Sequence, residues 1–157
     1  MVAQGLSLVV DSQNCPEFDV SWLPGELRWS DSDSGFVRLD ISDPILKGLP
    51  SELRGKRVVI DAFDGGDAGW RFLGDPKGIA IRKHGKGYII LCQVGMPATL
   101  WDGSPAVFVE NLFRFAAHGR LDKPTLVLDP GTGATSASGP IIEPVSALNL
   151  PFVQCDY

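Results

Sequence analysis

Apolar and polar side chains alternate with a period of two along several short stretches of the chain, and this alternation predicts β-strands. Residues 5–10 form a short apolar run that predicts a buried strand, and residues 36–41 alternate as a half-buried strand does. Residues 57–63 predict a third strand. Further short strands are expected at 125–129 and 152–154, so strands are spread along the whole chain.

The clearest local pattern predicts a β-hairpin over residues 78–93. Two apolar stretches flank the sequence His84-Gly85-Lys86-Gly87. Glycine adopts positive φ angles at little cost, which is what a tight hairpin turn requires. We therefore expect one strand on each side of this turn.

The apolar period changes to that of a helix over residues 105–118. Ser104 is suited to cap the helix, and Pro105 is suited to its first position. Gly119 fits the C′ position that ends a helix. The bulky apolar residues gather mostly on one face, which predicts an amphipathic helix that packs on the strands. These residues are Val107, Phe108, Leu112, Phe113, Phe115 and Ala116.

Two segments show no regular period. Residues 11–35 contain prolines and a Ser/Asp run, and they predict an irregular segment that Trp22 and Trp29 anchor onto the body of the protein. Residues 130–140 are small and polar, which is typical of a linker or loop. The pattern thus predicts a hairpin and a helix flanked by irregular segments.

Composition narrows the classes of function. A length of 157 residues fits one domain with one core. The net charge of −5 argues against a nucleic-acid partner, because phosphate binding needs clustered Lys and Arg. No apolar run reaches the roughly 20 residues that a membrane helix needs. The three cysteines are far apart, so we expect reduced thiols and a cytoplasmic protein, although one disulfide remains open.

The middle of the chain resembles a known superfamily. The stretches DPILKGLP (43–50), RVVIDAF (57–63), GIAIRKHGKGYIILCQVG (78–95) and VFVENLFRFA (107–116) are similar to the C-terminal half of class I glutamine amidotransferase-like domains. Among these domains, the ThuA-like and β-galactosidase-trimerisation-type members are the most similar. Asp43 stands where the family usually has histidine, so the chain departs from the family motif at this position.

The resemblance covers roughly residues 5–118 and implies a flavodoxin-like, three-layer α/β fold. The first β-α units of such a fold would precede Gly5, so we expect the sheet to be incomplete at its N-terminus. We assign residues 1–122 to this α/β domain and residues 123–157 to a C-terminal strand, a Gly/Ser-rich loop and a tail. An incomplete sheet has an exposed edge. Either a partner chain or a homo-oligomer is then expected to cover it.

Cys92 is the candidate nucleophile, because catalytic members of this superfamily use a cysteine on a tight strand-to-helix turn. Here Cys92 lies within an apolar strand and lacks the flanking glycines of such a turn. The sequence therefore favours a buried cysteine that acts as a small hydrophobe. His84 and His118 are the only imidazoles. Neither is expected near Cys92, and two histidines without a third ligand do not predict a zinc site.

Acidic and aromatic residues offer weaker candidates. Asp61, Asp64 and Asp67 around the turn at 64–69 have part of the spacing of a calcium-binding loop, but a solvated turn is the favoured interpretation. Trp70 and Trp101 are candidates for stacking on a sugar ring, and a role as core or interface anchors is favoured for both. The chain contains no recognisable phosphate-binding glycine motif, so no cofactor or metal is expected.

Together these features predict a non-catalytic accessory or assembly domain associated with a carbohydrate-active protein. Its partner is expected to be a second copy or another chain. A cysteine-dependent hydrolase or amidotransferase-like enzyme that uses Cys92 is the first alternative. A sugar-binding module that uses Trp70 and Trp101 is the second.

Overall fold

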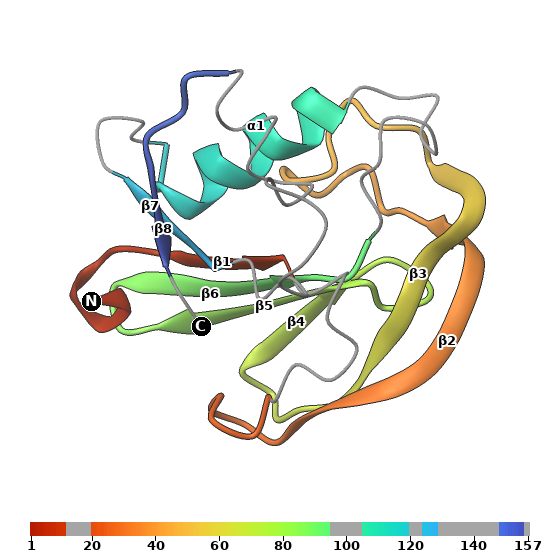
Figure 1. Ribbon diagram of the computed structural model, residues 1–157, viewed down its shortest axis with the longest axis horizontal. Helices are drawn as coiled ribbons and strands as arrows, with labels where there is room; N and C mark the ends of the chain where they lie inside the picture. The colour runs from red at the N-terminus through yellow and green to blue at the C-terminus, as the bar shows by residue number, and fades with distance from the viewer. Residues whose placement is uncertain (12–19, 95–104, 120–123, 129–147, 156–157) are drawn as a thin grey trace.

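The computed structural model describes residues 1–11, 20–94, 105–119, 124–128 and 148–155. A six-stranded sheet has the strand order β4-β5-β6-β1-β7-β8, and a separate ribbon pairs β2 with β3 (Figure 1). The elements are η1 (Val2–Gln4), β1 (Leu8–Asp11), β2 (Leu27–Arg38), β3 (Glu52–Gly65), β4 (Trp70–Leu73), β5 (Ile79–His84), β6 (Gly87–Cys92), α1 (Pro105–Ala116), β7 (Thr125–Leu128) and β8 (Phe152–Cys155).

The six-stranded sheet is mixed. Strands β6, β1, β7 and β8 run parallel, whereas β5 and β4 pair antiparallel with their neighbours. The chain passes from β6 through α1 to β7, and it crosses β1 on the way. Such a parallel crossover needs a long connection, usually a helix. The sequence-based α/β class is thus confirmed in its coarse form, with strands dominating the described residues.

Helix α1 covers one face of this sheet. Its residues Phe108, Leu112 and Phe113 are buried, and they belong to the same apolar cluster as Ile90 and Cys92 of β6. We call this cluster the first core. The apolar side chains of the predicted amphipathic helix therefore face the strands, as the sequence indicated.

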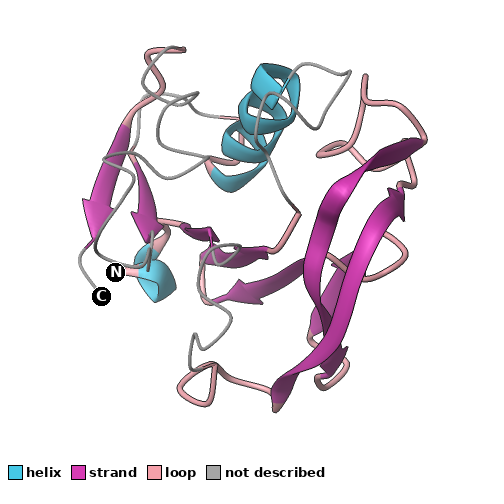
Figure 2. Ribbon diagram, turned by 45° about the vertical axis from the view of Figure 1, so that its right-hand side comes forward, coloured by secondary structure: helices cyan, strands magenta, loops and turns pink. Residues whose placement is uncertain are grey.

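The opposite face of the sheet has its own apolar cluster, which we call the second core. Val10 and Leu91 of the sheet pack there with Leu23, with Phe63 of β3 and with Trp70 of β4. Among the described residues no α-helix covers this face. Figure 2 shows the β2–β3 ribbon running along one side of the molecule, beside the sheet. Ribbon side chains contribute to both cores.

The predicted hairpin is confirmed, and its two glycines have different functions. Gly85 has a φ of 61°, the left-handed conformation that the turn requires. Gly87 is needed for space instead, because a Cβ atom there would lie 1.9 Å from the carbonyl oxygen of Leu6. The backbone N–H of Lys86 also donates to the carbonyl of Ala3 at 3.2 Å. The turn is therefore packed directly against the N-terminal segment.

The prediction of an irregular segment over residues 11–35 is wrong in its second half, because β2 already begins at Leu27. The predicted strand over residues 36–41 likewise ends at Arg38. Strand β2 includes the polar Ser/Asp run, and its pairing with β3 shifts register between Asp31 and Ser34. A two-stranded ribbon does not need a period-two apolar pattern, because cross-strand pairing can outweigh local propensity.

Two further details differ from the prediction. The helix ends with a Schellman motif in which Gly119 N–H donates to the carbonyl of Arg114 and His118 N–H donates to that of Phe115. The left-handed C′ residue is therefore His118, with a φ of 53°, and Gly119 occupies the following position. Trp22 is 49% exposed, so its side chain is not buried as expected.

Among the described residues, no helix is both long and apolar enough to cross a membrane.

We expect Gly87→Ala to lower the free energy of unfolding by at least about 2 kcal/mol, because the new methyl group must displace the Leu6 backbone. Gly119→Ala is the matched control. It has no heavy atom within 4 Å of the added Cβ, so only the left-handed conformation costs energy, by about 1 kcal/mol. Urea unfolding measures both. Equal losses in the two variants would contradict the close approach at Gly87.

Candidate functional site

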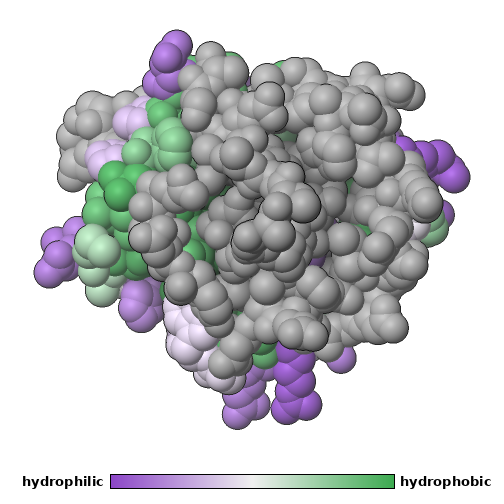
Figure 3. All heavy atoms as spheres, in the orientation of Figure 1, coloured by the Kyte–Doolittle hydropathy of each residue, from purple (hydrophilic) through white to green (hydrophobic). Residues whose placement is uncertain are grey.

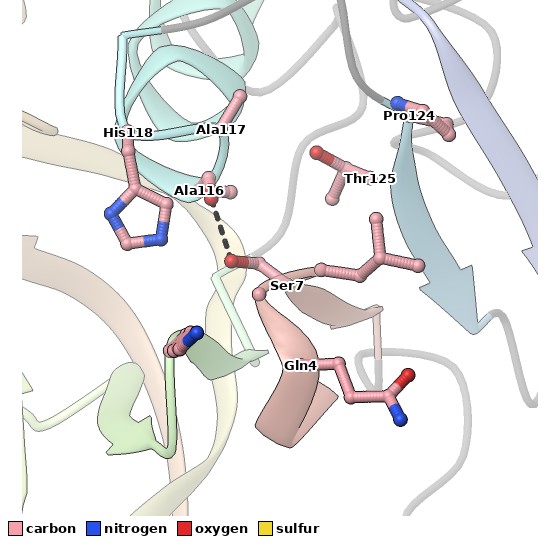
Figure 4. A pocket seen from close by; sticks show the side chains of 10 residues that line it. Gln4, Ser7, Ala116, Ala117, His118, Pro124 and Thr125 are labelled. Atoms are coloured by element: carbon pink, nitrogen blue, oxygen red, sulfur yellow. Dashed lines mark hydrogen bonds between the residues drawn. The ribbon is translucent and has the colours of Figure 1, made fainter. Parts of the chain in front are cut away.

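A pocket of about 390 Å³ lies beside the amino ends of β1 and β7, the turn before β6 and the carboxyl end of α1 (Figure 4). We call it the amino-edge pocket. Its polar side chains come from Gln4, Ser7, Lys86, His118 and Thr125. Its volume lies within the range typical of small-molecule sites. The hairpin turn, the helix end and the N-terminal segment thus meet at one site.

Ser7 joins three elements at the floor of this pocket. Its side chain is buried, and its hydroxyl donates to the carbonyl of Ala116 at 2.6 Å (Figure 4). The same oxygen accepts the backbone N–H of Tyr88 at 3.1 Å. The hydroxyl proton is therefore already used in a hydrogen bond. Ser7 links β1, β6 and α1 and is not set up as a nucleophile.

His118 lines the pocket and packs against a neighbouring ring. The left-handed backbone of this residue is uncommon for a non-glycine residue, although histidine is among the types that adopt it most often. Its ring lies 5.0 Å from the ring of Tyr88, which in turn lies 4.7 Å from the ring of Phe115. The helix end and this row of rings together hold the imidazole at the pocket.

Cys92 lies at the other end of β6, away from the pocket. Its side chain is fully buried in the first core, and its Sγ atom contacts the carbonyl oxygen of Val94 at 3.9 Å. His84 pairs with Gly87 beside the hairpin turn. Gly87 lies five residues before Cys92, which is roughly 16 Å at the usual rise of a strand. The described structure therefore brings neither His84 nor His118 to Cys92, and it places the thiol where a hydrophobe belongs.

Gln93, which was not singled out from the sequence, has a buried amide without hydrogen-bond partners in the described structure. Ile90, Cys92 and Val94 face the first core, so alternation along the strand turns Gln93 toward the second. It is 1% exposed, and in the described structure neither its Nε2 nor its Oε1 atom has a hydrogen-bond partner. Such burial is costly. A single glutamine after an apolar strand gives no sequence signal of this kind.

Trp70 is an internal residue. Its side chain is 6% exposed, and its indole N–H donates to the carbonyl of Pro24 at 2.8 Å. The guanidinium of Arg82 lies 5.7 Å from the ring centroid. These contacts support the interpretation of Trp70 as a core anchor and leave little of its ring for a sugar. Trp101, the second stacking candidate, lies outside the described residues.

Among the described acidic candidates, Asp64 and Asp67 do not belong to a metal-binding group. Asp67 forms an ion pair with Arg82, and this contact together with the Gly69 N–H lowers the pKa of the Asp67 carboxyl below its ordinary value of 3.8. The Asp64 carboxylate accepts the N–H of Gly65 at 2.8 Å. The side chain of Asp61 is not among those described. Within the described residues, no group of three or more His, Cys, Asp or Glu side chains could hold a metal ion.

Comparison with known proteins adds no relative. No family model, no curated protein and no solved structure matches the chain. The amidotransferase-like resemblance over roughly residues 5–118 therefore stays a prediction from the sequence. What the protein does has to be argued from the arrangement of its own side chains.

We expect Gln93→Met to raise the free energy of unfolding by about 1–3 kcal/mol, because it replaces an unpaired buried amide with an apolar chain of similar length. Gln4→Met is the control, since Gln4 is exposed and its change should stay within about 0.5 kcal/mol. Urea unfolding monitored by circular dichroism measures both. A clear loss of stability in Gln93→Met would show that the amide is bonded in the folded protein.

Proposed function

We propose that the chain is a non-catalytic assembly domain whose function is to associate with a second copy of itself. The proposal includes the finer fold expected from the sequence, a flavodoxin-like sheet of the amidotransferase-like superfamily, and an association with a carbohydrate-active protein. The parallel order β6-β1-β7-β8 and the α1 crossover support such a fold. The superfamily and its carbohydrate context rest on the sequence resemblance.

The proposal is supported by exposed apolar side chains on the β8 side of the sheet. Strand β8 is the outermost strand of the described sheet, and Val153 on it is 48% exposed. Leu148 and Phe152 beside it are only partly buried. Figure 3 shows apolar side chains gathered on this side of the molecule. An outer strand that presents apolar side chains is a site at which protein chains associate.

The opposite edge of the sheet is protected. Beyond β4, Arg38 and Asp75 exchange two backbone hydrogen bonds of 2.9 Å, so the end of β2 is tied to the chain that follows β4. Arg71 on β4 also forms an ion pair with Asp43 and lies over the ring of Phe115. Charged side chains and a covering segment are common means of blocking edge association. This contrast favours β8 over β4 as the associating side.

The burial of Cys92 supports the non-catalytic part of the proposal. A reactive cysteine needs an accessible thiolate and a base that activates it. The thiol of Cys92 is instead enclosed in the first core, with the described imidazoles at the far end of its strand. An amidotransferase-like reaction at this residue would need the core around it to open.

The test is Val153→Lys, which places a charge on the proposed contact. We expect the wild-type chain to elute from size-exclusion chromatography with light scattering at a multiple of the single-chain mass. The Val153→Lys variant is expected at the mass of one chain, because a buried lysine without a partner is costly. Ile41→Lys is the control, since Ile41 is 47% exposed but lies in a turn far from β8 in the sequence.

Two results would contradict the proposal. One is a wild-type protein that remains a monomer at all concentrations, which would mean that the β8 side binds no second copy. The other is an unchanged mass in Val153→Lys, which would place the contact elsewhere. Circular dichroism of each variant confirms that it has folded before its mass is interpreted.

A further inference from the structure

We propose that the amino-edge pocket is a binding site for a small organic anion, either a carboxylate or a phosphate ester. The pocket combines a volume of about 390 Å³ with side chains that donate hydrogen bonds. A small ligand with one anionic group and a polar body fits a pocket of this size and chemistry. The inference is independent of the proposed self-association, which concerns the β8 side of the sheet.

The charges around the pocket favour an anion. Lys86 and His118 line it, and none of its lining residues in the described structure is Asp or Glu. The absence of acidic residues from the described lining contrasts with the whole chain, whose net charge is −5. Lys86 carries an ammonium group, and the imidazole of His118 offers at least one N–H donor whether it is neutral or charged. The described lining residues therefore carry a more positive charge than the chain as a whole.

A helix carboxyl end normally repels anions, because its last carbonyl groups are unpaired acceptors. Here the last four carbonyls of α1 all have donors. Three of them accept backbone N–H groups: the carbonyl of Phe113 accepts that of Ala117, the carbonyl of Arg114 that of Gly119, and the carbonyl of Phe115 that of His118. The fourth, Ala116, accepts the Ser7 hydroxyl. The helix end thus presents to the pocket acceptors that already have donors, while Lys86 and His118 offer donors to a ligand.

The backbone at Lys86 and at His118 is held in place by hydrogen bonds. Lys86 lies in the hairpin turn, where its N–H donates to Ala3 and where Gly87 packs against the Leu6 carbonyl. His118 is held by the Schellman motif and by its ring contact with Tyr88. Groups that are already in place lose little conformational freedom when a ligand binds. The left-handed backbone of His118, which is unfavourable for a side chain, is then explained by the position it gives the imidazole.

The remaining polar groups suit the body of such a ligand. Thr125 begins β7, and its hydroxyl faces the pocket (Figure 4). Gln4 contributes a side-chain amide from η1. Hydroxyl and amide groups bind neutral oxygen and nitrogen atoms of a ligand, while Lys86 and His118 bind its charge. The arrangement predicts that the charge of the ligand, more than its shape, decides whether it binds.

The test uses probes that differ in charge. We would titrate the ¹⁵N-labelled full chain with glucuronate, glucose 6-phosphate and glucose, each to about 20 mM, and follow amide shifts by NMR. Millimolar dissociation constants are measurable in this range. We expect one or both anions to shift the amides of Lys86, His118 and Thr125, and glucose to leave them unchanged. Comparison of the two anions decides between a carboxylate and a phosphate ester.

Matched variants test the site itself. Lys86→Met keeps the length of the side chain and removes its charge, and it should weaken anion binding about tenfold, the loss expected for one charged contact. Lys83→Met makes the same change in net charge on the same hairpin, outside the pocket, and should stay within about twofold. His118→Asn retains a residue type that tolerates the left-handed conformation and should also weaken binding.

Three results would overturn the inference. The first is the absence of any shift with both anions in a folded wild-type chain. The second is equal binding of glucose, which would show that charge plays no part. The third is an equal loss in Lys86→Met and Lys83→Met, which would reveal a non-specific effect of net charge. None of these results bears on the mass of the protein in solution, so this inference and the proposed self-association can fail separately.

Discussion

The packing of α1 against β6 fixes both the burial of Cys92 and the position of the helix end. Phe108, Leu112 and Phe113 of the helix bury themselves in one core with Ile90 and Cys92 of the strand. This contact fixes the position of the helix end, and Ser7 then ties that end to β1 and β6 by hydrogen bonds. The same contact encloses Cys92 and removes its thiol from solvent. The helix end that it positions lines the amino-edge pocket.

The parts of the fold that the sequence predicted are those whose signals are local. The hairpin was predictable because glycines in the turn separate two apolar strands, and the helix because its apolar residues repeat with a helical period. Cys92 was assigned to the core for the same reason, since it ends an apolar strand without the glycines of a catalytic turn. In each case the burial in the structure follows from the pattern of neighbouring residues.

The remaining features depend on contacts between distant residues. The polar run in β2 becomes strand because β3 pairs with it, and β4 pairs with β5 while its Trp70 packs in the second core. The pocket joins Lys86 to His118 through the packing of a turn on a helix end. Neither the unpaired amide of Gln93 nor the left-handed φ of His118 has a signature in the neighbouring sequence. Tertiary structure alone reveals the candidate site.

The core of this domain encloses Cys92, so its thiol is expected to be unreactive in the folded protein. The most direct measurement is the rate at which iodoacetamide labels Cys92 in a folded Cys15→Ser, Cys155→Ser variant, compared with the rate in urea. Labelling in the native state is expected to be slower by at least about a thousandfold, because the thiol reacts only when the core opens. Native labelling as fast as that of the unfolded chain would contradict the enclosure of Cys92.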